Sequence, residues 1–190
     1  DSVASRGLGD VYKRQAPGLS ASNVIENADM AMYHAKALGR GQYALFNPNM
    51  RQEARERLAL EESLRHAVNN NQIQAHLQPI VRLIDGSLLG FEALARWEHP
   101  QLGLLSPSTF IEAAEENGLI EEIDLGVITE ACHAVAALQQ IEARDPFRLS
   151  VNVSARTLGA VDFISRLKPI LHESCIKPNT LLLAVSYTHL

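Results

Sequence analysis

The segment from residue 91 to residue 97, Phe-Glu-Ala-Leu-Ala-Arg-Trp, constrains the fold more than any other part of the chain. Glu92, Leu94 and Arg96 alternate with Phe91, Ala93 and Ala95, and successive side chains of a β-strand point to opposite faces of its sheet. The pattern therefore predicts a strand that carries an acid and a guanidinium on one face. Two interpretations stay open at this point. The strand could be half-solvated, or a metal ion or phosphate could compensate the charges, since burying an unpartnered charge is costly.

Strands and helices alternate around this segment. The apolar patterns predict strands over 73–81, 88–97, 148–154 and 181–183, and helices over 22–39, 47–71, 107–117, 121–140 and 161–172. Asp85-Gly86 is a tight-turn signal, so the first two strands are expected to form an antiparallel hairpin. The later alternation of strands and helices favours an α/β fold with a parallel-type barrel or an open sheet.

Several motifs occur together in this part of the chain. They are Leu77-Gln78-Pro79-Ile80-Val81, the segment 91–97, Gly118-Leu119-Ile120 and Val151-Asn152-Val153-Ser154. On these motifs, the stretch from about Arg51 to Leu183 closely resembles the EAL-domain family, the phosphodiesterases of cyclic di-GMP. The resemblance implies a modified TIM-like (β/α) barrel with one antiparallel strand. Only about its first half is expected here, because a complete barrel needs roughly 250 residues.

The resemblance also implies roles for five residues. Glu92 and Asn152 match metal ligands of the family, and the implied cofactor is a pair of Mg²⁺ or Mn²⁺ ions that activate water and open cyclic di-GMP to linear pGpG. The substrate-binding positions are matched by Gln78, by Leu94 against the guanine, and by Arg96 at a phosphate, where a planar guanidinium gives paired hydrogen bonds.

Two of these residues could instead have a purely structural role, without contact to a ligand. By its own pattern, Asn152 could be a structural polar residue bonded to the neighbouring backbone. Gln78 shares a strand face with Gln74 and His76, and such a polar row could be a solvated edge.

One position departs from the family. The second ligand glutamate of the family follows a run like Leu181-Leu182-Leu183, and Ala184 stands at that place. The later carboxylates and the lysine of the family are expected beyond Leu190. The chain is therefore expected to contain no catalytic residue and to be inactive as written, although it derives from a phosphodiesterase. The alternative is a parent protein that is a non-catalytic cyclic di-GMP receptor or scaffold with a degenerate EAL domain.

A second resemblance concerns the region near the start of the chain. Residues 27–40 are similar to the last helix of a GGDEF domain, the diguanylate cyclase fold, in which the positions of Lys36 and Arg40 contact phosphates. The same two cations could be a solvated basic turn that the helix dipole favours. Gly41 replaces an asparagine of the family, and the signature loop is absent, so no cyclase activity is expected from this chain.

These patterns predict five segments. Residues 16–46 are expected to be the C-terminal remnant of a GGDEF domain, residues 47–71 a linking helix, and residues 72–185 the N-terminal half of an EAL domain. The ends, residues 1–15 and 186–190, resemble translated sequencing-adapter read-through and are expected to be a non-native leader and tail. Natural disordered termini are the alternative for both.

Composition narrows the remaining function classes. The net charge of −5 gives no indication of a surface for a nucleic acid polymer. Cys132 and Cys175 lack metal-like spacing and are expected to be buried or semi-buried free thiols. No apolar run approaches a membrane span, so a cytoplasmic location is expected, with any anchor in upstream segments of the parent. The expected partners are cyclic di-GMP, a second copy through the EAL domain, and an upstream sensory domain.

Overall fold

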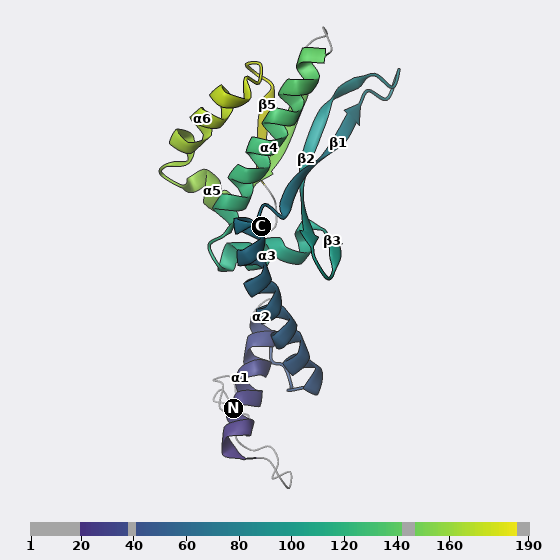
Figure 1. Cartoon of the computed structure of the whole chain (residues 1–190). Coiled ribbons are helices and arrows are strands. Elements are labelled where there is room, and N and C mark those ends of the chain that lie inside the picture. Colours follow the sequence, from purple (N-terminus) through teal and green to yellow (C-terminus); the bar gives the residue numbers. More distant parts are fainter. Residues whose placement is uncertain (1–19, 38–40, 142–146, 186–190) are drawn as a thin grey trace. The chain divides into compact units, whose positions relative to one another are not determined.

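The computed structural model describes residues 20–37, 41–141 and 147–185. The chain divides into two compact units, Asp1–Ala59 and Leu60–Leu190. Each unit is described by itself, with the element labels of Figure 1.

The first unit contains α1 (Ala21–Ala37) and the N-terminal part of α2 (Pro48–Asn69). These helices cover the ranges in which helical spacing was expected, as far as the described residues extend. The Arg51 guanidinium donates a hydrogen bond of 2.8 Å from Nη2 to Asn27 Oδ1. Arg57 lies over the Tyr33 ring at 5.1 Å from its centroid. Polar and cation–π contacts of this kind connect α1 to α2.

The second unit is built on a five-stranded sheet. Its strands are β1 (Ile73–Val81), β2 (Leu88–His99), β3 (Gly103–Leu105), β4 (Arg148–Val153) and β5 (Leu181–Val185). Their order is β1-β2-β4-β5, and β3 pairs with β2 at one end. β1 runs antiparallel to β2. β4 lies between β2 and β5 and runs parallel to both. The α/β fold is confirmed, but two strands, β1 and β3, run antiparallel to β2, where one antiparallel strand was expected.

The turn between β1 and β2 forms where the sequence predicted it. Gly86 has a φ of +68°, a conformation that glycine adopts without a steric penalty. Asp85 Oδ1 accepts hydrogen bonds from the Ser87 backbone N–H at 3.0 Å and from the Ser87 hydroxyl at 2.7 Å. These bonds lower the pKa of the Asp85 carboxyl group. Local turn chemistry therefore fixes the register of the hairpin.

Among the described residues, the second unit also contains the C-terminal part of α2 and four further helices. They are α3 (Pro107–Glu116), α4 (Ile120–Ile141), α5 (Ala155–Gly159) and α6 (Phe163–Ser174). α4 lies along the sheet, and α6 packs beside α4 (Figure 1). The core between these helices and the sheet includes the fully buried side chains of Trp97, Ile128, Val135, Leu149 and Val151. Alternate residues of each strand supply this core, so the intervening residues face the other side of the sheet.

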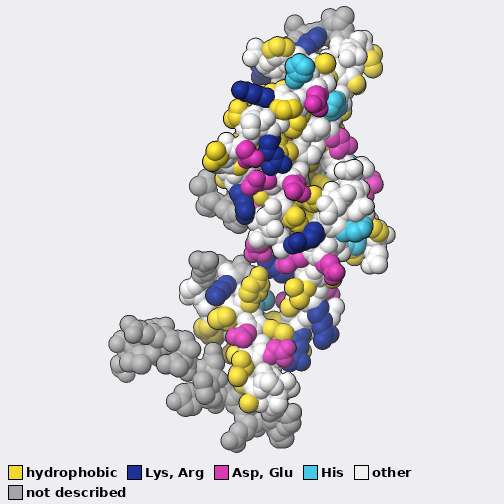
Figure 2. Space-filling view, turned by 60° about the vertical axis from the view of Figure 1, so that its left-hand side comes forward, with side chains coloured by type: hydrophobic (Ala, Val, Ile, Leu, Met, Phe, Trp, Pro, Cys, Tyr) yellow, Lys and Arg dark blue, Asp and Glu magenta, His cyan; other side chains and the backbone are white. Residues whose placement is uncertain are grey.

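The two free cysteines differ in their exposure. Cys132 is buried, but Cys175 is exposed, so the expectation of burial was wrong for Cys175, which ends α6 in a left-handed conformation. No helix among the described residues is long and apolar enough to cross a membrane. On the second unit, acidic and basic side chains intermingle over the face shown in Figure 2.

Candidate functional site

The strand register brings the predicted site residues onto one face of the sheet. Gln78 of β1 lies directly opposite Glu92 of β2 in the antiparallel pair. On the other side of β2, Glu92 aligns with Ser150 of β4, two residues before Asn152. Ala93 and Val151 point into the core, as does every second residue along their strands. Gln78, Glu92 and Asn152 therefore share the opposite face of the sheet.

Two of these residues touch each other. The Asn152 side-chain amide donates a hydrogen bond of 2.9 Å from Nδ2 to Glu92 Oε1, although the two residues are 60 positions apart in sequence. The contact joins β2 to β4 on the polar face. It leaves the amide oxygen of Asn152 and the second carboxylate oxygen of Glu92 as further acceptors. The sequence predicted both residues as metal ligands, and the structure brings them together.

The donor set of this pair fits a hard divalent ion. Mg²⁺ and Ca²⁺ take carboxylate and amide oxygens, and both oxygens here project from neighbouring strands. Within the described ranges, no group of three or more His, Cys, Asp or Glu residues could hold a metal ion. The assignment of Glu92 and Asn152 as metal ligands stays a prediction.

Arg96 and Leu94 continue the same face of β2. Arg96 is half-buried, and its Nη1 donates a hydrogen bond of 2.8 Å to the backbone carbonyl of Ala95. A guanidinium carries five N–H donors, so this bond orients the group without using its capacity for an anion. Leu94 lies opposite His76, and Arg96 lies opposite Gln74. Gln78 and His76 are exposed, and the role of Gln78 as a substrate contact stays a prediction.

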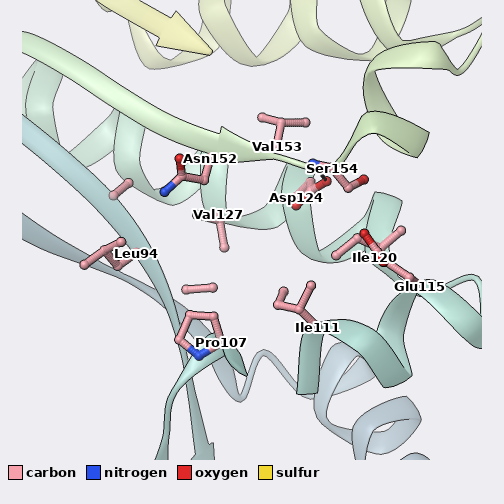
Figure 3. Close-up of a pocket in the computed structure, with 12 residues that line it drawn as sticks. Leu94, Pro107, Ile111, Glu115, Ile120, Asp124, Val127, Asn152, Val153 and Ser154 are labelled. Carbon is pink, nitrogen blue, oxygen red and sulfur yellow. Dashed lines mark hydrogen bonds between the residues drawn. The ribbon is translucent and has the colours of Figure 1, made fainter. Parts of the chain in front are cut away.

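A pocket of about 100 Å³ opens beside Asn152. Figure 3 shows Leu94 and Asn152 approaching it from the strands, while Ile111 and Val127 approach it from α3 and α4. Its wall is mostly apolar, and the acidic side chains of Glu115 and Asp124 lie at one end. The pocket lies at the carboxyl end of β4, the region where open α/β sheets bind ligands.

Asp124 is a buried acid that the motif analysis missed. It is 6% exposed, and its Oδ2 accepts hydrogen bonds from the Ser154 backbone N–H at 2.9 Å and from Thr157 Oγ1 at 2.6 Å. Burial raises the pKa of the Asp124 carboxyl group, and these hydrogen bonds oppose the rise. One sequence signal could have revealed it: Asp124 stands four residues after Ile120, within the apolar stripe of its helix.

The departure at Ala184 falls inside the site. Ala184 of β5 aligns with Asn152 of β4 in the parallel register. At this position, beside a candidate metal ligand, the chain therefore carries a methyl group and no carboxylate.

The two cations matched to the GGDEF domain lie elsewhere. Lys36 is exposed near the end of α1, in the first unit. Arg40 lies outside the described residues. Their assignment as phosphate contacts stays a prediction.

Comparison with known proteins identifies the family. Residues 61–190 match the model of the EAL domain, and the chain belongs to this family. A bifunctional diguanylate cyclase/cyclic di-GMP phosphodiesterase, MucR of Pseudomonas aeruginosa, is 37% identical over 169 residues. The alignment covers 89% of this chain and 24% of MucR. The cyclic di-GMP phosphodiesterase PdeR of Escherichia coli is 38% identical over 175 residues, and the alignment covers 88% of this chain and 26% of PdeR.

A solved structure shows the same fold. The phosphodiesterase of P. aeruginosa MucR in complex with cyclic di-GMP matches with a TM-score of 0.62 and 34% identity, over 66% of this chain and 50% of that chain. The present chain thus spans about a quarter of the two curated relatives and half of the solved chain. These proportions agree with a partial barrel.

Proposed function

We propose that this chain is part of a cytoplasmic EAL phosphodiesterase that hydrolyses cyclic di-GMP to linear pGpG. The observation that carries the proposal is the 2.9 Å contact between Asn152 and Glu92 on the polar face of the sheet. It joins the Asn152 amide nitrogen to a Glu92 carboxylate oxygen. The contact thereby brings together a carboxylate and an amide group, whose oxygens are ligand types that Mg²⁺ and Mn²⁺ take. The similarity to MucR and PdeR, both named for action on cyclic di-GMP, supports the choice of substrate.

Each residue has a distinct part in this proposal. Glu92 and Asn152 would hold Mg²⁺ or Mn²⁺, which when bound supplies a Lewis acid and an activated water. Arg96, already oriented by the Ala95 carbonyl, would donate to a phosphate oxygen of the substrate. Leu94 would pack against a guanine, and Gln78 would donate to the nucleotide from β1. All five side chains project from the same face, so one bound dinucleotide could reach them.

The competing function is a cyclic di-GMP receptor or scaffold without turnover. Ala184 favours it, because the register places this residue beside Asn152, where the family carries a second carboxylate ligand. The intact pair of Glu92 and Asn152 favours the enzyme. We therefore keep hydrolysis as the proposed function of the parent protein.

The 190-residue polypeptide by itself is proposed to be inactive. Two oxygen ligands cannot hold two divalent ions tightly, and the described residues offer no larger cluster. We also propose that residues 16–46 are the end of a GGDEF domain, that residues 47–71 link it to the EAL region, and that the EAL region supports a homodimer. The helices found over 21–37 and 48–69 support the first two assignments.

The proposal is tested in an extended chain, defined as residues 1–185 joined to the C-terminal half of the EAL domain of MucR. Arg96→Ala removes a charge-assisted contact worth roughly 1.5–3 kcal/mol. The affinity for cyclic di-GMP should therefore fall by about ten- to a hundredfold. Glu92→Ala should abolish turnover, while binding of the dinucleotide measured in EDTA is largely kept.

Titration calorimetry in Mg²⁺ and in EDTA, with chromatographic detection of pGpG, separates the two effects. Glu122→Gln is the matched control, because Glu122 is exposed on α4. Normal turnover in Glu92→Ala would show that Glu92 is not a ligand. Unchanged affinity in Arg96→Ala would remove Arg96 from the substrate contacts.

A further inference from the structure

A buried hydrogen-bond network lies beside the pocket that Asn152 lines. Asp124 of α4 holds the segment that follows β4 through the Ser154 N–H and the Thr157 hydroxyl. Ser154 is the N-cap of α5, and its Oγ accepts a hydrogen bond of 3.1 Å from the Thr157 N–H. Ser154 and Thr157 are themselves 4% and 1% exposed. One carboxylate thus fixes the turn between β4 and α5.

A charge at this position is costly for the fold. Among the ion pairs of the described residues, none involves Asp124. The hydrogen-bond partners of Asp124, Ser154 and Thr157, are neutral. Burial raises the pKa of Asp124, and the negative charge of Glu115 adds to this rise. Buried polar groups that a fold keeps at a cost in stability tend to mark functional positions.

The position of Asn152 explains what such a group could do. The pairing of β4 with β2 ends at Val151, opposite Ala93, so Asn152 lies one residue beyond the last pair with β2. Its side chain is exposed, and core packing does not hold it. Two residues further along, the Ser154 N–H is bonded to Asp124. On the β5 side, Asn152 still pairs with Ala184. On the β2 side the ladder has ended, and the next anchor along the chain is the bond from the Ser154 N–H to Asp124.

We propose that Asp124 is a positioning residue that fixes the end of β4 and thereby keeps the Asn152 amide beside Glu92. The proposal rests on the proposed function, since it concerns the metal ligands of that site. Figure 3 shows Asp124 directed at Ser154 on the same strand end as Asn152, around the pocket that all three residues line. Asp124 acts through the backbone and contacts neither the ion nor the substrate.

Metal binding by the extended chain tests this role without requiring turnover. The electron paramagnetic resonance signal of free Mn²⁺ gives the Mn²⁺ affinity of the wild type and of Asp124→Ala, Asp124→Asn and Thr157→Val. Loss of a group that hydrogen-bonds a metal ligand typically lowers metal affinity by about ten- to a hundredfold. Asp124 acts one step further away, through the backbone of Ser154, so Asp124→Ala should lower the Mn²⁺ affinity by about tenfold, the lower end of that range. Asp124→Asn keeps an oxygen that accepts both bonds, so it should remain close to the wild type. Thr157→Val removes one bond and should lie between them.

A merely structural role predicts a different pattern. It would lower the number of Mn²⁺ sites per chain in Asp124→Ala and leave the affinity of the folded fraction unchanged. That result would overturn the proposal. The proposal would also be overturned if Thr157→Val kept the wild-type affinity while Asp124→Asn and Asp124→Ala lost affinity equally. Binding of cyclic di-GMP in EDTA should be equal in all variants, and Glu122→Gln should match the wild type throughout.

The two proposals fail in distinguishable ways. If the wild-type extended chain binds Mn²⁺ and cyclic di-GMP but releases no pGpG, the phosphodiesterase function is contradicted, and the Mn²⁺ comparison still decides the role of Asp124. If the wild-type extended chain binds no Mn²⁺, both proposals are overturned.

Discussion

Replacing Gly90 by alanine tests how closely β2 and β4 must approach to bring Glu92 to Asn152. A Cβ atom on Gly90 would overlap the backbone carbonyl of Arg148, its register partner in β4. The overlap involves backbone, so no side-chain rotation relieves it. We expect Gly90→Ala to force the two strands apart at the beginning of their pairing.

The magnitude follows from opposing terms. Overpacking costs about 1–3 kcal/mol, and each weakened backbone hydrogen bond costs about 0.5–1.5 kcal/mol. Replacing a glycine within a strand returns about 0.5–1 kcal/mol of conformational entropy. With one weakened hydrogen bond, the free energy of unfolding should therefore fall by about 0.5–4 kcal/mol.

Gly126→Ala is the matched control for this prediction. Gly126 lies exposed on α4, and a Cβ there would meet nothing within 4 Å. The same substitution should therefore stabilise the chain by about 0.4–1 kcal/mol. Urea denaturation of the extended chain, followed by circular dichroism, gives both values. A Gly90→Ala variant as stable as Gly126→Ala would refute the close approach of the two strands.

Three further predictions concern the chain itself. In the described part of the 190-residue polypeptide, β1 and β5 are the edges of the sheet, and open edges are templates for association. Light scattering should therefore find oligomers or aggregates. A monomer with a sharp cooperative melt would contradict this prediction. Burial raises the pKa of Cys132 to about 11, whereas Cys175 is exposed. Iodoacetamide near neutral pH should therefore modify Cys175 alone in the native chain, because the thiolate is the reactive form. Equal labelling of both thiols would contradict the burial of Cys132. Because its pKa is raised above 3.8, Asp124 contributes stability that is lost as pH rises through its folded pKa. Asp124→Asn should thus gain stability relative to the wild type between mild acid and neutral pH, and a difference that stays constant with pH would contradict the burial of a charge.

The sequence was sufficient to predict most of the elements because their signals are local. The alternation in 73–81 and 88–97 and the Asp85-Gly86 turn predicted the hairpin, which the structure confirms. β3 was missed because Gly103–Leu105 is too short to show a period of two. α5 was missed because its five residues give little more than one turn, and its cap at Ser154 was counted as the end of a strand.

The site was predictable only in part, for a physical reason. Alternation along one strand shows that Glu92 and Arg96 share a face, and the resemblance added Asn152 to them. The contact between Asn152 and Glu92 depends on the register of two strands 60 positions apart, which no local pattern contains. Asp124 is one of three acids at the start of α4, with Glu121 and Glu122, and its spacing from Ile120 is the one local sign that it turns inward. Its bonds to Ser154 and Thr157, 30 and 33 positions away, depend on the packing of the helix against the end of β4.

Turnover by the extended chain decides whether the EAL region of this protein supports hydrolysis of cyclic di-GMP. Purified protein is incubated with cyclic di-GMP in Mg²⁺ and in EDTA, and linear pGpG is measured by chromatography. We expect pGpG in Mg²⁺ only, and faster release by Ala184→Glu, which restores a carboxylate beside Asn152. If the wild-type extended chain binds cyclic di-GMP but releases no pGpG, hydrolysis is contradicted and the receptor function is favoured.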